Sequence, residues 1–287
     1  MKMSLDCIPC FIRQALDAAR MTSDNPAVHE KILSEVLQWA CNVDLKQPAP
    51  MIGQRIHQRL RQIVGRDDPY RNAKDHQNNM AMAMLPELQA RIDAASDPLD
   101  MALRIAIAGN VIDLGVPGTV TDFKIRETLE NCLTEPLIGK PEEFKAAVAK
   151  ARKILYLTDN AGEIAFDRLL IARLRPERVT VAVRGGPAIN DATIPDAIAV
   201  GMPELVKVTD NGSDAPGTVL SDCSQSFRQL FKEADMIIAK GQGNFETLSD
   251  EPGNIFFLFK AKCKVIADHA EVKLGSHVVT SFYTSDN

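Results

Sequence analysis

The hydrophobic pattern of this 287-residue chain changes its period part-way along, and this change limits the possible folds. Up to about residue 150, apolar residues recur three and four positions apart, as on one face of a helix. Ile8 to Ala19 and Ile32 to Ala40 are clear examples. Breaks that contain proline separate such stretches. The N-terminal part is therefore predicted to be helical.

From about residue 151, short apolar runs alternate with helical segments. The runs are Ile154–Leu157, Val179–Val183, Leu205–Val208, Met236–Ala239 and Val265–Ala267. Helix candidates lie between them, near 162–174, 192–200, 218–233 and 246–261. Buried runs separated by helices indicate βαβ units and a parallel sheet. We predict an α/β fold, with a three-layer α/β/α Rossmann-like domain and a mostly parallel sheet over residues 101–287, after an all-helical domain over residues 1–100.

The charge and the apolar content exclude several classes of protein. The net charge is −5 and the sequence pI is about 5.6, which argues against a nucleic acid or an anionic membrane as partner. No apolar run reaches the roughly 18 residues of a membrane helix, and no signal-peptide pattern is present. We expect a soluble, cytoplasmic protein with reduced thiols. The sequence does not predict its oligomeric state.

Polar segments, most of them rich in Gly or Asn, follow all five predicted strands. Ligands of open parallel sheets bind beyond the carboxyl ends of the strands. Asp159 and Asn160 follow the first strand, and Asp191 follows the second. An N-cap role would explain Asp159 or Asn160, but hardly both together with Asp191. Their oxygen atoms suit Mg²⁺ or Mn²⁺, so we predict a metal site.

A glycine-rich segment after the fourth strand is a candidate phosphate site. It reads Lys240-Gly241-Gln242-Gly243-Asn244 and precedes a predicted helix. Glycines let backbone N–H groups approach an anion, and the helix N-terminus and the lysine add positive charge. A flexible turn with a surface lysine is the alternative. The chain lacks the dinucleotide fingerprint, the P-loop and the Gly-x-Ser-x-Gly elbow.

Several short motifs, kept in order along nearly the whole chain, resemble the damage-control phosphatase family. This family was first catalogued as domain of unknown function 89 and includes the acidic-residue-methyltransferase-like proteins. The C-terminal motifs are Asp159-Asn160-Ala161-Gly162-Glu163, Asn190-Asp191, Lys240-Gly241-Gln242-Gly243-Asn244 and Lys262-Cys263. Others are similar to its prokaryotic, CxxC-bearing branch: Cys7-Ile8-Pro9-Cys10, Asp68-Pro69-Tyr70 with Lys74, and Gly109-Asn110-Val111-Ile112-Asp113.

The resemblance implies a helical domain followed by a Rossmann-like domain, and metal-dependent hydrolysis of phosphomonoesters, often sugar phosphates or damaged cofactor intermediates. It implies metal ligation by Asp159, Asn160 and Asp191. Substrate or phosphate contacts are expected at Asn110, Asn190, Lys240, Gly241, Gln242, Gly243, Asn244 and Lys262.

We therefore expect a metal-dependent phosphatase with a small phosphorylated metabolite as substrate and Mg²⁺, Mn²⁺, Co²⁺ or Ni²⁺ as cofactor. Lys240 is expected to stabilise charge on the phosphoryl oxygens. Asp191 or Glu163 is expected to orient the attacking water or to move a proton. Asp159 could instead be a covalent nucleophile. The sequence leaves this choice, the substrate and the preferred metal open.

Three other functions stay open at this point. One is a carboxyl methyltransferase that uses S-adenosylmethionine, although the usual Gly-x-Gly turn is missing. Another is a protein that binds a phosphometabolite without hydrolysing it. The third is a thiol-redox protein, because Cys7 and Cys10 begin a predicted helix, where a thiolate is stabilised. Packing, redox and metal roles all remain open for these two cysteines.

Overall fold

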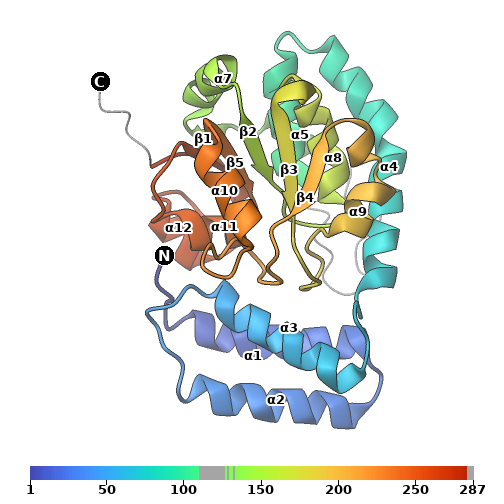
Figure 1. The fold of residues 1–287 in the computed structure, drawn as a ribbon, viewed down its shortest axis with the longest axis vertical. Coiled ribbons are helices and arrows are strands. Elements are labelled where there is room, and N and C mark those ends of the chain that lie inside the picture. Colours follow the sequence, from blue (N-terminus) through green and yellow to red (C-terminus); the bar gives the residue numbers. More distant parts are fainter. Residues whose placement is uncertain (110–126, 128, 132, 283–287) are drawn as a thin grey trace.

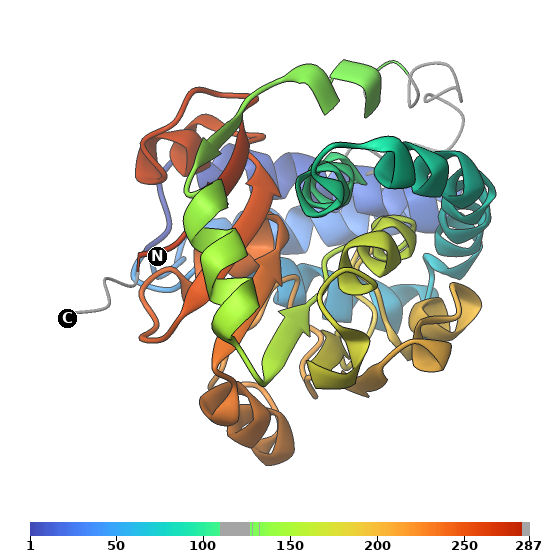
Figure 2. The ribbon, with the colours of Figure 1, turned by 90° about the horizontal axis from the view of Figure 1, so that it is seen from above.

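The computed structural model describes residues 1–109, 127, 129–131 and 133–282. One seven-stranded sheet forms its centre, and a bundle of helices lies beyond one end of the sheet (Figure 1). Seen from above, helices cover both faces of the sheet (Figure 2). The predicted α/β fold with a mostly parallel sheet is confirmed.

The strands are β1 (Leu137–Gly139), β2 (Ile154–Leu157), β3 (Val179–Val183), β4 (Lys207–Asp210), β5 (Met236–Lys240), β6 (Ile255–Lys260) and β7 (His277–Thr280). They lie in the order β1-β7-β6-β5-β2-β3-β4, and every neighbouring pair is parallel except β6 and β7. The chain order reverses at β2, with β3 on one side and β5 on the other. Such a reversal opens a crevice at the carboxyl ends of the two strands beside it.

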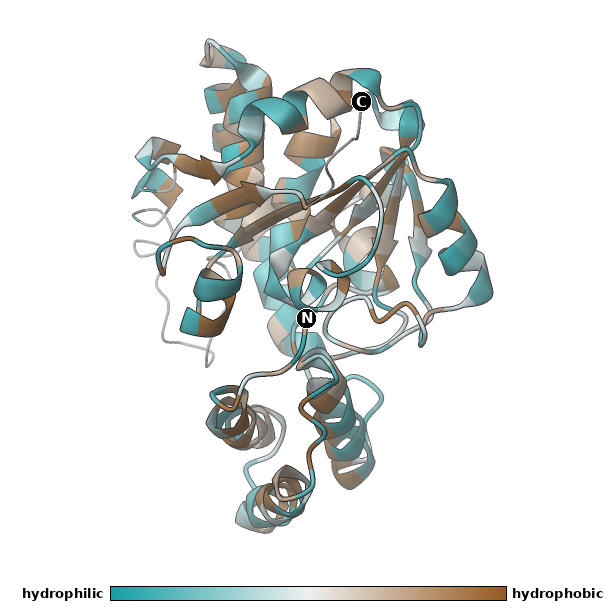
Figure 3. Cartoon of the chain, turned by 90° about the vertical axis from the view of Figure 1, so that its left-hand side faces the viewer, coloured by the Kyte–Doolittle hydropathy of each residue, from teal (hydrophilic) through white to brown (hydrophobic). Residues whose placement is uncertain are grey.

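Side chains alternate between two hydrophobic layers along the central strands. In β2, Ile154 and Tyr156 pack into one core, and Leu155 and Leu157 pack into the other. The first core is covered by α4 (Arg71–Ala94), α5 (Pro98–Ala108), α7 (Pro141–Lys150), α8 (Glu163–Ile171) and α9 (Ile194–Ala199). The second is covered by α10 (Gln225–Glu233), α11 (Gly241–Leu248) and α12 (Lys264–His269). Figure 3 shows the brown, hydrophobic strands between these helices.

The remaining helices have a core of their own. They are α1 (Cys7–Thr22), α2 (Pro26–Ala40) and α3 (Pro50–Val64), and their shared core runs from Met3 to Tyr70. The helix ends follow from local chemistry. The Asn25 side chain caps α2 just before its first residue, Pro26. Gly65, with a φ of 69°, ends α3 in the left-handed conformation. The predicted domain boundary at residue 100 stays a prediction.

Polar side chains of α3 hold the bundle over the carboxyl ends of the strands. Gln54 and Gln58 donate hydrogen bonds of 2.7 and 2.9 Å to the carboxylate of Asp214, which lies in the loop after β4. Arg61 pairs with the same carboxylate and also donates to the carbonyl oxygen of Pro187, after β3. The bundle therefore covers the edge at which the predicted site residues gather.

The fifth predicted strand is wrong. Residues 265–267 lie in α12, whereas the expected helix at 246–261 contains the end of α11 and all of β6. The chain turns at Gly253 and Asn254, and the large apolar run from Ile255 then pairs between β5 and β7. A strand buried on both faces has no polar alternation, so its pattern resembles that of a buried helix.

Each helix in the described ranges is too short or too polar to cross a membrane.

Two short 3₁₀ turns, at Pro176–Arg178 and Met202–Glu204, precede β3 and β4.

Candidate active site

The loops after β2 and β3 pair with each other and bring the predicted metal ligands together. Ala161 N–H donates to the Asn190 carbonyl oxygen, and Ala192 N–H donates to the Asp159 carbonyl oxygen, each over 2.8 Å. Asn160 and Asp191 form a backbone bridge between these two bonds. The side chains of Asp159, Asn160 and Asp191 consequently line one cavity, as expected from the shared edge of parallel strands.

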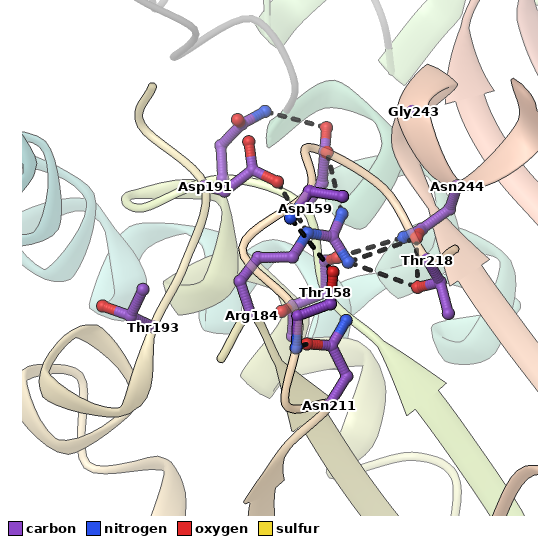
Figure 4. A network of polar contacts seen from close by, with 12 residues as sticks. Thr158, Asp159, Arg184, Asp191, Thr193, Asn211, Thr218, Gly243 and Asn244 are labelled. Atoms are coloured by element: carbon purple, nitrogen blue, oxygen red, sulfur yellow. Dashed lines mark hydrogen bonds and ion pairs between the residues drawn. The ribbon is translucent and has the colours of Figure 1, made fainter. Parts of the chain in front are cut away.

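A buried arginine links this group to the loop after β4 and to α11. Arg184 is 2% exposed, and its Nε donates to Asp191 Oδ2 over 2.6 Å. Its other nitrogens approach Asp159 Oδ1 at 3.9 Å and Asn244 Oδ1 at 3.2 Å (Figure 4). Thr218 Oγ1 donates to the same Asn244 oxygen over 2.7 Å. Arg184 was not a predicted site residue, although it directly follows β3.

The carboxylates at this site repel one another. Burial, together with the nearby charges of Glu163 and Asp191, raises the pKa of Asp159 well above its usual value. Arg184 and Lys262 oppose this shift only in part. A carboxylate destabilised by burial and by like charges gains from a bound cation. The electrostatics therefore favour positive charge beside Asp159.

The donor atoms fit a hard divalent cation. Asn160 Nδ2 donates to Asp159 Oδ2 over 2.8 Å, which leaves the amide oxygen as the side-chain donor atom for a cation. In the part of the chain that the structure describes, no three His, Cys, Asp or Glu side chains are arranged to hold a metal ion. With two carboxylates and one amide, a cation would need water or substrate oxygens as further ligands, as Mg²⁺ and Mn²⁺ accept.

The predicted phosphate contact of Lys240 requires correction. Its ammonium is fully buried and donates to Glu163 Oε1 at 2.7 Å, Asp167 Oδ1 at 2.6 Å and the Ala106 carbonyl oxygen at 2.8 Å. It does not line the cavity. Burial raises the pKa of Asp167 to about 6, and Tyr156 donates to the same carboxylate. Lys240 thus balances buried carboxylates behind the site.

Glu163 also lies behind the cavity wall. Its carboxylate accepts from Lys240 and, over 3.2 Å, from Asn160 Nδ2. Of the two residues expected to orient water, Asp191 lines the cavity and Glu163 does not. Glu163 is therefore placed to orient Asn160.

The glycines after β5 let α11 begin against Asp159. Gly241 has a φ of 78°, and a Cβ atom there would lie 2.1 Å from Asp159 Oδ2. Gln242 and Gly243 line the cavity, as do Asn190 and Lys262. Asn244 is fully buried and donates to the Thr158 and Lys240 carbonyl oxygens, so it fixes the loops instead of facing the cavity. The predicted residue Asn110 lies outside the described residues.

A second polar network supports the loops from behind. Asn78 of α4 accepts from Gly162 N–H over 2.7 Å and donates to Asp196 Oδ1 over 3.0 Å. Lys74 pairs with Asp196 at 2.7 Å, and both side chains are fully buried. Asp196 also completes a capping box with Thr193 at the start of α9. Sequence reasoning missed Asn78 and Asp196, because only the fold brings α4 to these loops.

A family model for the damage-control phosphatase ARMT1-like domain matches residues 3–278. The chain belongs to the ARMT1-like damage-control phosphatase family. This confirms the resemblance seen in the sequence motifs. All the loops described above lie within the matched residues.

Relatives within this damage-control phosphatase family match the chain along nearly its whole length. A protein of Archaeoglobus fulgidus named damage-control phosphatase is 34% identical, over 97% of this chain and 98% of that protein. Damage-control phosphatase PH1575 of Pyrococcus horikoshii is 34% identical, over 97% of both. The crystal structure of a DUF89 family protein from the same organism has a TM-score of 0.87 at 33% identity, covering 97% of this chain and 98% of that one. Membership of a damage-control phosphatase family supports a phosphatase activity.

Proposed function

We propose that this chain is a metal-dependent phosphatase that hydrolyses small phosphorylated metabolites. The observation that carries the proposal is the meeting of Asp159, Asn160 and Asp191 beside the N-terminus of α11 in one cavity. The cavity has a volume of about 710 Å³, within the range of small-molecule sites. The names of the relatives favour this function over a methyltransferase or a binding protein.

Each side of the site has a separate task in the proposed reaction. Asp159, Asn160 and Asp191 would hold a divalent ion, which would polarise the phosphoryl oxygens and lower the pKa of the attacking water. The first N–H groups of α11, with Lys262 at the cavity wall, would bind phosphoryl oxygens. Asp191 would orient the water. Arg184 would fix Asp191, and Lys240 would fix Glu163 and, through it, Asn160.

The test is phosphate release from a panel of phosphomonoesters, with and without Mg²⁺, Mn²⁺, Co²⁺ or Ni²⁺. We expect metal-dependent release, and a loss of at least about 100-fold in kcat/KM for Asp191→Ala. Calorimetric titration of the metal should show weaker binding by the same variant. Asp24→Ala, at an exposed carboxylate, is the matched control.

No release with any metal from folded protein would refute a phosphatase function. Full metal-stimulated turnover in Asp191→Ala would refute the assigned role of this residue. Trapping of phosphate on Asp159 would show a covalent route instead of direct attack by water.

A further inference from the structure

The cavity has a second end that the proposed reaction does not use. We call it the thiol end and define it by Cys7, Cys10, Cys263 and Glu246, which all line the cavity. Each of the three thiols lies within electrostatic range of the Glu246 carboxyl group. The charges that act on Asp159 are those of Glu163, Asp191, Arg184 and Lys262, and none of these residues belongs to the thiol end.

Helix geometry explains how the thiol end is built. Cys7, Cys10, Phe11 and Gln14 of α1 line the cavity, at the spacing i, i+3, i+4 and i+7. This spacing is one face of a helix. On α11, Gln242 and Gly243 line the cavity four and three residues before Glu246, so they lie on the same side of this helix as Glu246. The three-residue spacing of Cys7 and Cys10 therefore places both thiols on the face of α1 that lines the cavity.

The thiols at this end are suited to forming a wall, not to reacting. Partial desolvation at the cavity wall raises the pKa of Cys7, Cys10 and Cys263, which keeps the thiols protonated at neutral pH, although Cys10 and Cys263 remain exposed to solvent. A protonated thiol is a poor nucleophile and a weak hydrogen-bonding group. Within the described residues, no three such side chains are arranged as metal ligands. The three thiols therefore give this part of the cavity wall short, polarizable and weakly polar side chains.

Glu246 is the exception in this wall. Burial raises the pKa of its carboxyl group to about 7, and no hydrogen bond or ion pair joins that group to any residue the structure describes. Glu246 is only half-buried by its exposed surface, but a desolvated carboxyl group without a partner is still destabilising unless a ligand supplies one. Its position on the cavity wall makes a bound ligand the available partner.

We propose that the thiol end is the subsite for the alcohol half of the phosphomonoester, and that Glu246 selects an uncharged, hydroxyl-bearing leaving group and rejects one that carries a carboxylate. This inference rests on the proposed phosphatase function. Hydroxyl groups would donate to the Glu246 carboxylate, whereas a second carboxylate would be repelled by it.

The charges around Glu246 do not offset its own charge, so Glu246 determines the preference for an uncharged leaving group. The amino group of Met1 donates to the Glu246 backbone oxygen at 2.6 Å and pairs with Asp250 at 3.3 Å. Lys264 pairs with Asp268 at 2.8 Å. Lys2 and Arg13 are exposed to solvent, which screens their charges, although the charge of Arg13 still reaches Cys10. The cations near this end are therefore paired or screened, and a leaving-group carboxylate would find little to offset Glu246.

A matched pair of substrates tests the inference. Glucitol 6-phosphate and gluconate 6-phosphate differ only in an alcohol or a carboxylate at the carbon farthest from the phosphate. Phosphate release at pH 8 gives kcat and KM for both, and p-nitrophenyl phosphate, which has neither group, reports the catalytic end. Glu246→Gln removes the charge, Glu246→Met removes it with little change of volume, and Glu251→Gln changes an exposed neighbour as the control.

The native chain should favour the alcohol over the carboxylate by about tenfold or more in kcat/KM. Both Glu246 variants should bring this ratio close to one, mainly through KM, while kcat for p-nitrophenyl phosphate stays within about twofold. Glu251→Gln should keep the native ratio. A native ratio that persists in active Glu246 variants would overturn the inference. If the native chain hydrolyses none of the three esters with any metal, the result counts against the phosphatase function itself. The subsite inference, which rests on that function, would then be lost as well.

Discussion

Gly241 lies so close to Asp159 that the site has no space for a side chain at this position. Its positive φ is unfavourable for any side chain, and a Cβ atom would enter the Asp159 carboxylate. Gly241→Ala should lower kcat/KM for phosphate release by about tenfold or more, and the free energy of unfolding by about 1–3 kcal/mol. Gly275→Ala is the matched control, because its φ is 88° and no atom lies within 4 Å of the added Cβ. It should lose stability but keep activity; equal activity of the two variants would contradict our account of Gly241.

Glu246 also makes a prediction about stability and pH. Its folded pKa of about 7 lies above the ordinary 4.5, so the folded chain holds this proton more tightly than the unfolded chain. This contribution to stability is present below about pH 4.5 and is lost as the pH rises to about 7. The facing groups are the thiols of Cys7, Cys10 and Cys263 and the Met1 ammonium.

Glu246→Gln should therefore be more stable than the native chain at pH 8, by about 1–3 kcal/mol, and equal to it near pH 4.5. Urea unfolding at both pH values measures the difference. A stability difference that does not change with pH would show that the carboxyl group titrates normally.

At the scale of elements, the buried ion pair between Lys74 and Asp196 joins α4 to α9. Lys74→Met would leave the Asp196 carboxylate buried with less compensation, and should lower the free energy of unfolding by about 3–5 kcal/mol. Lys150→Met, on the exposed end of α7, is the control. Chemical denaturation measures both. Adding Asp196→Asn to Lys74→Met should recover part of the lost stability. If Lys74→Met were as stable as Lys150→Met, a structural role for the ion pair would be excluded.

Sequence patterns predict some elements better than others, for physical reasons. The bounds of β2 and β3 were predicted as observed, because each is a short buried run bordered by turn residues or a polar loop. β6 was missed, because a run without alternation fits a buried helix equally well. The meeting of Asp159 with Asp191 was predictable, since parallel strands end at one edge. The partners of Lys240 were not, because Ala106 and Asp167 approach it only through tertiary packing.

At the scale of the whole molecule, Asp214 joins the helical bundle to the sheet region. Asp214→Ala would leave Gln54, Gln58 and Arg61 without this acceptor and should loosen the bundle over the cavity. We expect KM to rise several-fold with a smaller change in kcat, and faster hydrogen exchange in α3. Asp75→Ala, in an exposed pair with Arg71, is the control. Unchanged KM and exchange would show that the bundle stays in place without Asp214.

The cavity lies between two separately packed parts of the chain, because α1 belongs to the bundle, whereas the catalytic loops, α11 and α12 belong to the sheet region. Substitutions on the cavity-facing side of α1 can change which molecules fit without disturbing the loops that carry out the chemistry. Descendants of a common ancestor could therefore acquire new substrates by drift and selection in one helix, while the catalytic machinery is inherited intact.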